Sequence, residues 1–141
     1  MGNDPTRVTI HVGQDPRLVA VVHGAARVAA MQAGFDDDHC DQFARASEEV
    51  CRESLLQLAD IGGSLELTLE TFSDRIEISI HHQGQLIPAL GLEAFVIQES
   101  FSGRPGGLTG AELLECVDRV TFNTENGVAR TTLVKYLPCR D

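Results

Sequence analysis

Three stretches of the chain alternate apolar and polar residues, and this period of two is typical of β-strands that bury one face. They are residues 7–12, 64–72 and 75–82. Ser73–Arg75 has the length of a tight turn, so the second and third strands are expected to form a hairpin. Residues 119–124 and 129–137 predict a second hairpin, because an Asn-Gly turn lies between them at residues 125–127.

Residues 17–34 instead repeat their apolar residues at the spacing of a helix. The predicted apolar stripe consists of Leu18, Val22, Ala25 and Ala29. Asp15 is a good N-cap, Pro16 is a good first helical residue, and Gly34 is a good helix end. These signals predict the first helix of the fold.

A second helix is predicted to begin at residues 36–38, whose three aspartates suit a helix N-terminus, and to end near Asp60 before two glycines. Its predicted apolar stripe consists of Cys40, Ala44, Cys51, Leu55 and Leu58. A third helix is predicted from Thr109, which forms a capping box with Glu112, to about Asp118.

Residues 83–107 follow neither period and are rich in glycine and proline around one short amphipathic piece, residues 92–100. Long irregular segments of this kind are typical of functional lids, so we expect a lid at about residues 85–105. The order of elements predicts one α+β domain over residues 1–141. We expect a two-layer sandwich with a mostly antiparallel, mixed sheet and helices on one face.

Charge narrows the range of partners. The formal net charge is −10 and the pI is about 4.8, and such a surface repels phosphate backbones and anionic lipid. We therefore expect no direct nucleic-acid or membrane partner, and a basic protein face is the more natural target. No apolar run approaches the length of a membrane span, and no apolar signal region opens the chain, which favours the cytoplasm. Four cysteines lack metal-finger spacing and are expected to be small buried residues: Cys40, Cys51, Cys116 and Cys139.

Three local sequences, together with the order of elements, point to a family. Residues 106–122, GGLTGAELLECVDRVTF, combine a glycine loop, a helix and an Asp-x-Val exit into a strand, and residues 131–137, TTLVKYL, follow as a last strand. With residues 46–57, ASEEVCRESLLQ, they make the chain from about Arg7 to Leu137 resemble the anti-sigma factor serine kinases. That family is a branch of the GHKL ATPases, which have the Bergerat fold. The resemblance implies protein serine kinase ancestry and three sequence boxes that bind Mg-ATP.

The first box of the family is Glu-x-x-x-Asn on a helix. The resemblance places Glu48 at the position of the catalytic acid and Arg52 at the position of the asparagine that ligates Mg²⁺. Arginine has donors but no acceptor, so it cannot ligate a metal ion. The alternative role for Glu48 and Arg52 is an i,i+4 salt bridge on the helix surface. Sliding the register by one pairs Glu49 with Glu53 and restores no asparagine.

The second box is Asp-x-Gly-x-Gly after a strand, and its aspartate accepts a hydrogen bond from the adenine amino group. Here the aspartate position is His82, and only Gly84 remains of the two glycines. A neutral histidine accepts one hydrogen bond, so adenine recognition is weakened. Because His81 and His82 point to opposite faces of a strand, they do not predict a metal site.

The third box is a glycine run that cradles phosphates at a helix N-terminus. Gly106 and Gly107 fit this run, whereas Thr109 replaces the next glycine and Gly110 follows one place late. Glu112 also brings a carboxylate into the first helical turn, where a capping role is simpler. Each of the three boxes therefore keeps a fragment and loses the group that does the chemistry.

These departures predict a binding protein: a catalytically degenerate relative of the anti-sigma kinases that acts by partner switching, without ATP, Mg²⁺ or another metal. The resemblance implies that its partner is a sigma factor or a STAS-domain antagonist. It also implies that two copies can pair through the first strand and first helix. Apolar residues of the lid would either pack or dock the partner; they include Leu90, Leu92, Phe95 and Phe101.

Two alternatives stay open. In the first, the protein is an active ATP-dependent serine kinase, in which Arg52 replaces the charge of the metal against the phosphates and Glu48 remains the base. In the second, Arg52 and His82 form a site for another anion, such as a nucleotide without adenine or a carboxylate metabolite.

Overall fold

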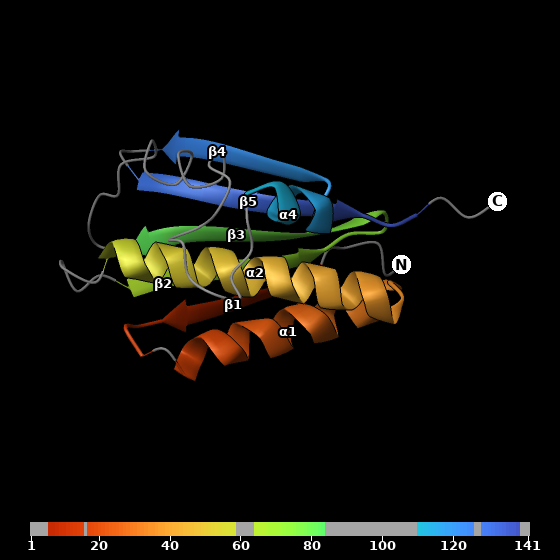
Figure 1. The fold of residues 1–141 in the computed structure, drawn as a ribbon, viewed down its shortest axis with the longest axis horizontal. Coiled ribbons are helices and arrows are strands. Elements are labelled where there is room, and N and C mark those ends of the chain that lie inside the picture. Colours follow the sequence, from red (N-terminus) through yellow and green to blue (C-terminus); the bar gives the residue numbers. More distant parts are fainter. Residues whose placement is uncertain (1–5, 16, 59–63, 84–109, 126–127, 139–141) are drawn as a thin grey trace.

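The structure of the chain is a computed structural model, and it describes residues 6–15, 17–58, 64–83, 110–125 and 128–138. Its elements follow in the order strand, two helices, two strands, helix, two strands (Figure 1). They are β1 (Thr6–Val12), α1 (Arg17–Ala33), α2 (Asp37–Leu58), β2 (Ser64–Thr71), β3 (Arg75–Gln83), α4 (Gly110–Cys116), β4 (Arg119–Glu125) and β5 (Val128–Tyr136). The predicted elements agree with these bounds to within about two residues. The predicted lid lies outside the described residues.

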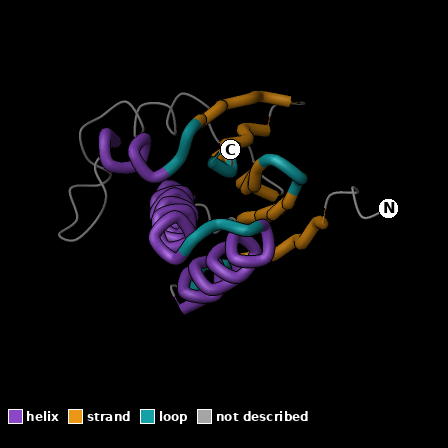
Figure 2. Tube along the Cα trace, turned by 90° about the vertical axis from the view of Figure 1, so that its right-hand side faces the viewer, coloured by secondary structure: helices purple, strands orange, loops and turns teal. Residues whose placement is uncertain are grey.

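The five strands form one sheet in the order β1-β2-β3-β5-β4, and the three helices lie on one face of it (Figures 1 and 2). The α+β prediction is therefore confirmed. The prediction of a mixed sheet is wrong for the described strands, because every pair of neighbours is antiparallel. β3 and β4 do run in the same direction, but β5 lies between them and is antiparallel to both.

The core lies between the sheet and the helices. Alternate residues of β2 and β3 are fully buried against the helix layer: Leu65, Leu67, Leu69, Ile76, Ile78 and Ile80. The intervening residues are polar and cross the outer face in rows; one row of hydroxyls runs Thr9, Thr68, Ser79, Thr132 and Thr121 through all five strands. One apolar face and one polar face per strand explain the period of two in the sequence.

The predicted apolar stripe of α1 is displaced by one residue. The buried residues are Val19, Val22, Ala26 and Ala30, whereas Leu18, Ala25 and Ala29 are only partly buried. Because α1 packs against α2 as well as against the sheet, its most buried residues are not those of a pattern with a single buried face. On α2 the facing residues are small or apolar, and Cys40, Ala44 and Cys51 are fully buried as predicted.

Local signals at the helix ends behave as expected. The Asp15 carboxylate accepts a hydrogen bond from the Arg17 amide at 3.0 Å and thus caps α1. Asp36 caps α2 in the same way through the His39 amide at 2.8 Å. Gly34 has a φ of +107° and ends α1. Its amide donates to the Met31 carbonyl, and the Phe35 amide donates to the Ala30 carbonyl.

A buried lysine joins three elements in a way that the alternation of β5 does not predict. Lys135 is 4% exposed, and its Nζ donates to the Cys116 carbonyl at 2.9 Å and to Gln42 Oε1 at 3.2 Å. It therefore fastens the end of α4 to α2 and β5, and burial lowers its pKa. Asp118 completes the connection by accepting a hydrogen bond from the Tyr136 amide at 2.7 Å.

Gly34 lies directly after α1, and Gly24 lies in the middle of it. Alanine at these two positions should change the free energy of unfolding in opposite directions. Gly34→Ala should lower the free energy of unfolding by about 1–2 kcal/mol, because a φ of +107° is strained for any residue with a Cβ. Gly24→Ala, inside the helix with nothing within 4 Å of the new Cβ, should raise it by roughly 0.5–1 kcal/mol. Urea denaturation of both variants measures the difference, and effects of equal sign would contradict the assigned conformations.

Candidate functional site

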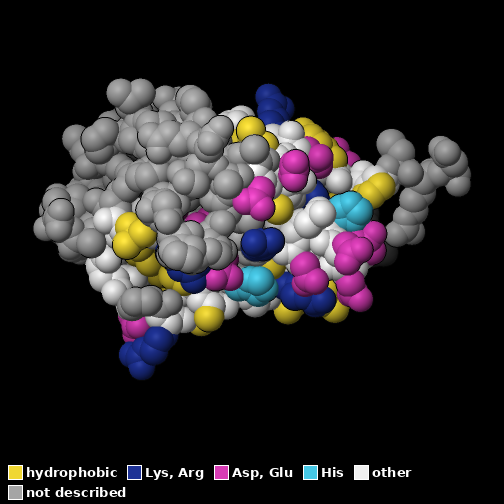
Figure 3. Space-filling model, viewed as in Figure 1, with side chains coloured by type: hydrophobic (Ala, Val, Ile, Leu, Met, Phe, Trp, Pro, Cys, Tyr) yellow, Lys and Arg dark blue, Asp and Glu magenta, His cyan; other side chains and the backbone are white. Residues whose placement is uncertain are grey.

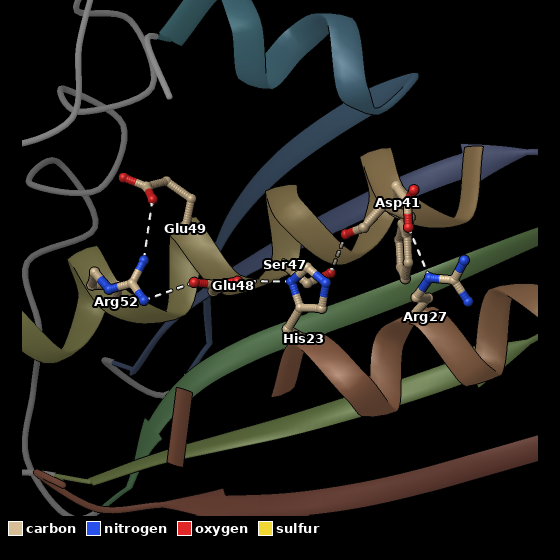
Figure 4. Close-up of polar contacts among 8 residues, drawn as sticks. His23, Arg27, Asp41, Ser47, Glu48, Glu49 and Arg52 are labelled. Carbon is tan, nitrogen blue, oxygen red and sulfur yellow. Dashed lines mark hydrogen bonds and ion pairs between the residues drawn. The ribbon is translucent and has the colours of Figure 1, made fainter. Parts of the chain in front are cut away.

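The candidate site is built on the middle of α2, where Glu48 lies between two nitrogen-bearing side chains (Figure 4). Arg52, one turn later, donates to Glu48 Oε2 at 2.7 Å. His23, which comes from α1, lies with Nδ1 2.7 Å from Glu48 Oε1. Both oxygens of the carboxylate are thus engaged within the chain, and the i,i+4 salt bridge considered from the sequence is present.

The ionised form of Glu48 is favoured by its neighbours. Burial alone would raise the pKa of this carboxyl, but hydrogen bonds from Arg52 and His23 oppose it, and the pKa is lowered below its ordinary value. Glu48 therefore carries its charge at neutral pH. The contact with His23 also ties α1 to α2, so this acid has a structural role whatever else it does.

Arg52 sits between two carboxylates of its own helix. Besides Glu48, its guanidinium lies 3.5 Å from Glu49 Oε1. The Glu49 side chain is only 5% exposed, so this contact is shielded from water more than an ordinary surface pair. Glu53 is also buried, at 1% exposure, on the same helix. The positive charge of Arg52 is accordingly balanced by acids that are part of the fold.

The other predicted site residues are described only in part. His82 lies in β3 and its backbone pairs with Leu65 in β2, but its side chain is outside the described structure. Its neighbour His81 is on the outer face of the sheet and contacts Glu66 at 2.8 Å. The glycine boxes and the lid lie outside the described residues, and with them the predicted residues Gly84, Leu90, Leu92, Phe95, Phe101, Gly106, Gly107 and Thr109.

Two further polar residues were not predicted. His23 is one of few polar residues in the centre of α1, and sequence alone does not tell which acid it meets. Thr131 is 1% exposed, and its Oγ1 has no hydrogen-bond partner among the described residues. Two consecutive threonines in a strand place one on each face, which is the signal that could have found it. A buried hydroxyl without a partner is uncommon and marks a place for water or a ligand group.

Within the described part of the chain, no group of three or more histidine, cysteine or carboxylate side chains is arranged to hold a metal ion. The helices described here are all too short or too polar to cross a lipid bilayer. Comparison of the chain with protein-family models and with curated proteins returns no match. The chemistry of the site is therefore argued from its own residues.

The position of Glu48 predicts a pH-dependent loss of stability on substitution. Glu48→Gln removes a charge that holds two helices together, so it should cost about 1 kcal/mol at pH 7. Because the folded-state pKa lies below the ordinary value of 4.5, this stabilisation is complete above about pH 4.5 and is lost as the pH falls through the lowered pKa. Denaturation of wild type and variant should differ at pH 7, and the difference should disappear as the pH falls below the lowered pKa of Glu48.

A matched control lies on the same pair of helices. Arg27 of α1 donates to Asp41 of α2 at 2.7 Å, but the Asp41 side chain is 61% exposed. Asp41→Asn should therefore cost only a few tenths of a kcal/mol. An equal cost for the two variants would show that the Glu48 contacts have no special weight.

Proposed function

We propose that the protein is an anti-sigma-factor-like regulator that binds a protein partner and does not turn over Mg-ATP. It would be a catalytically degenerate member of the serine kinase branch of the GHKL ATPases, with the Bergerat fold. The observation that carries the proposal is the engagement of Arg52 by Glu48 and Glu49. The α+β architecture, with α2 laid across a five-stranded antiparallel sheet, is compatible with that fold.

The charges around Arg52 argue against a nucleotide at this position. An incoming phosphate would have to take the guanidinium away from Glu48 and Glu49, and their carboxylates would then face the added negative charge. A metal ion would gain nothing from Arg52, because the guanidinium has no acceptor atom. Arg52 itself therefore offers Mg-ATP neither a metal ligand nor an uncompensated positive charge.

The distribution of charge supports a basic protein partner. Acidic side chains gather at the end of the helix layer where α2 begins, as Figure 3 shows. The side chains of Asp37 and Asp41 are 88% and 61% exposed, and Asp38 is also exposed. Such a surface accelerates the encounter with a positively charged face and orients it. A sigma factor or a STAS-domain antagonist with a basic contact face is the partner we propose.

A second copy of the chain is the other proposed partner. β1 is an edge strand, and beside it α1 presents exposed apolar side chains, Val21, Val28 and Met31. A groove beside them is lined by Val8 of β1, Leu69 of β2 and a largely apolar part of α1 that includes Gly24 and Val28 and one polar residue, Gln32. An open strand edge next to an apolar helix face is suited to pairing with the same two elements of another protomer.

The alternative function, an active kinase with an atypical site, has one observation in its favour. Glu48 is held in the ionised state that a catalytic base requires. In that alternative Arg52 would face the phosphates in place of the metal. This alternative requires a nucleotide to reach Arg52, which nucleotide titration tests directly.

Partner binding without nucleotide is the expected behaviour. Purified sigma factors and STAS-domain proteins of the source organism should be titrated by calorimetry in nucleotide-free buffer, where one of them should bind with a Kd of about 1 μM or tighter. Adding Mg-ATP should leave the Kd unchanged and should produce no phosphorylated partner. Micromolar, magnesium-dependent ATP binding, or transfer of the γ-phosphate, would establish the kinase alternative instead.

Pairing of two copies should depend on the exposed face of α1. Val28→Asp puts a charge into the apolar groove and should shift a dimer to monomer in sedimentation equilibrium, with little effect on the fold because Val28 is 53% exposed. Leu114→Asp is the matched control, since Leu114 is equally exposed but lies on α4. If both variants sediment like the wild type, the β1–α1 surface is not the dimer contact.

A further inference from the structure

A cavity lies at the end of the molecule formed by the α1–α2 turn, the β2–β3 turn and the end of β5. It has a volume of about 710 Å³, within the usual range for ligand sites. Ala33, Leu137 and Pro138 give it apolar walls, and Asp36 and Asp74 contribute carboxylates. Glu48 and Arg52 are not among its lining residues, so the cavity is separate from the candidate site.

Backbone hydrogen bonds fix the three segments that surround the cavity. The Leu137 amide donates to the Asp74 carbonyl at 2.9 Å and joins the end of β5 to the β2–β3 turn. On the other side, Gly34 closes α1, and a Cβ built on it would lie 3.9 Å from the Leu137 side chain. A ligand would therefore enter a frame that is already formed, which reduces the entropy cost of binding.

The two carboxylates retain capacity to accept hydrogen bonds. Nδ1 of His39 lies 2.6 Å from Oδ1 of Asp36. Arg75 donates a hydrogen bond to Oδ1 of Asp74 at 2.8 Å. The side chains of Asp36 and Asp74 are 65% and 63% exposed, so both carboxylates can accept further hydrogen bonds. Hydrogen bonds from His39 lower the pKa of Asp36, so this group is ionised at neutral pH. Apolar walls with anionic acceptors fit a cation on an aliphatic stem.

We infer that this cavity receives a basic side chain, arginine or lysine, from the surface of the protein partner. The methylene stem would lie on Ala33, Leu137 and Pro138 while the cationic head meets the carboxylates of Asp36 and Asp74. The acidic start of α2, at Asp37 and Asp38, adjoins the cavity and would steer a basic surface toward it. This inference rests on the proposed function only in taking the partner to be a basic protein.

The test uses the full chain and the peptide acetyl-Ala-Arg-Ala-amide as a probe, followed by ¹⁵N–¹H NMR. The amides of Gly34 and Ser73 should shift in a saturable way, and the analogue with citrulline in place of arginine should bind about tenfold more weakly because it lacks the charge. Asp36→Asn combined with Asp74→Asn should weaken arginine-peptide binding to a similar extent. Asparagine still caps a helix and suits a turn, so this variant should keep its fold.

The matched control is Glu112→Gln combined with Glu115→Gln, which removes the same charge from exposed positions of α4 that do not line the cavity. It should bind the peptide nearly as well as the wild type. The inference is overturned if no saturable shift occurs, if the citrulline peptide binds equally well, or if the control variant loses as much affinity as the cavity variant. A partner that binds wild type and cavity variant alike would overturn the cavity site while leaving the proposed function standing.

Discussion

The contact between α1 and α2 is the constraint on which the rest of the structure depends. Small side chains allow the two helices to approach closely, with Ala26 and Ala30 on one and Ala44 and Cys51 on the other fully buried. At the edge of this contact, His23 of α1 forms a hydrogen bond with Glu48 of α2. A shift of α1 would expose the core and would at the same time break the His23–Glu48 contact. Packing and electrostatics therefore specify the same arrangement.

This constraint gives Glu48 a structural role that does not depend on catalysis. Glu48 bridges α1 to Arg52, and both contacts are charge-assisted. Removing the carboxylate would cost stability even in a protein that never binds nucleotide. Glu48 by itself is therefore weak support for catalysis, because both of its carboxylate oxygens are already used within the fold. The ion pairs of Arg52 are the stronger argument against nucleotide binding, because a guanidinium balanced by Glu48 and Glu49 offers little to a phosphate.

Much of the fold could be predicted from the sequence, because its strands alternate cleanly and its helices carry strong end signals. Asp15, Asp36 and Gly34 act through neighbouring backbone groups, which are fixed by sequence distance. Which residues of α1 are most buried, and why the described neighbouring strands are all antiparallel, depend instead on which elements contact one another in the fold. At the site, the Glu48–Arg52 pair follows from i,i+4 spacing, whereas His23 lies 25 residues from its acid and could not be paired in advance. The contact between Lys135 and the Cys116 carbonyl could not be predicted for the same reason.

We propose that the ionised carboxylate of Glu48 is fully engaged by Arg52 and His23 and therefore does not serve a nucleotide. The most direct measurement is a ¹³C NMR titration of the Glu48 side-chain carboxyl, with and without Mg-ATP. The account predicts that Glu48 titrates below its ordinary pKa of 4.5, and that Mg-ATP leaves the titration and the chemical shift unchanged. An ordinary or raised pKa, or a shift that saturates with Mg-ATP, would contradict it.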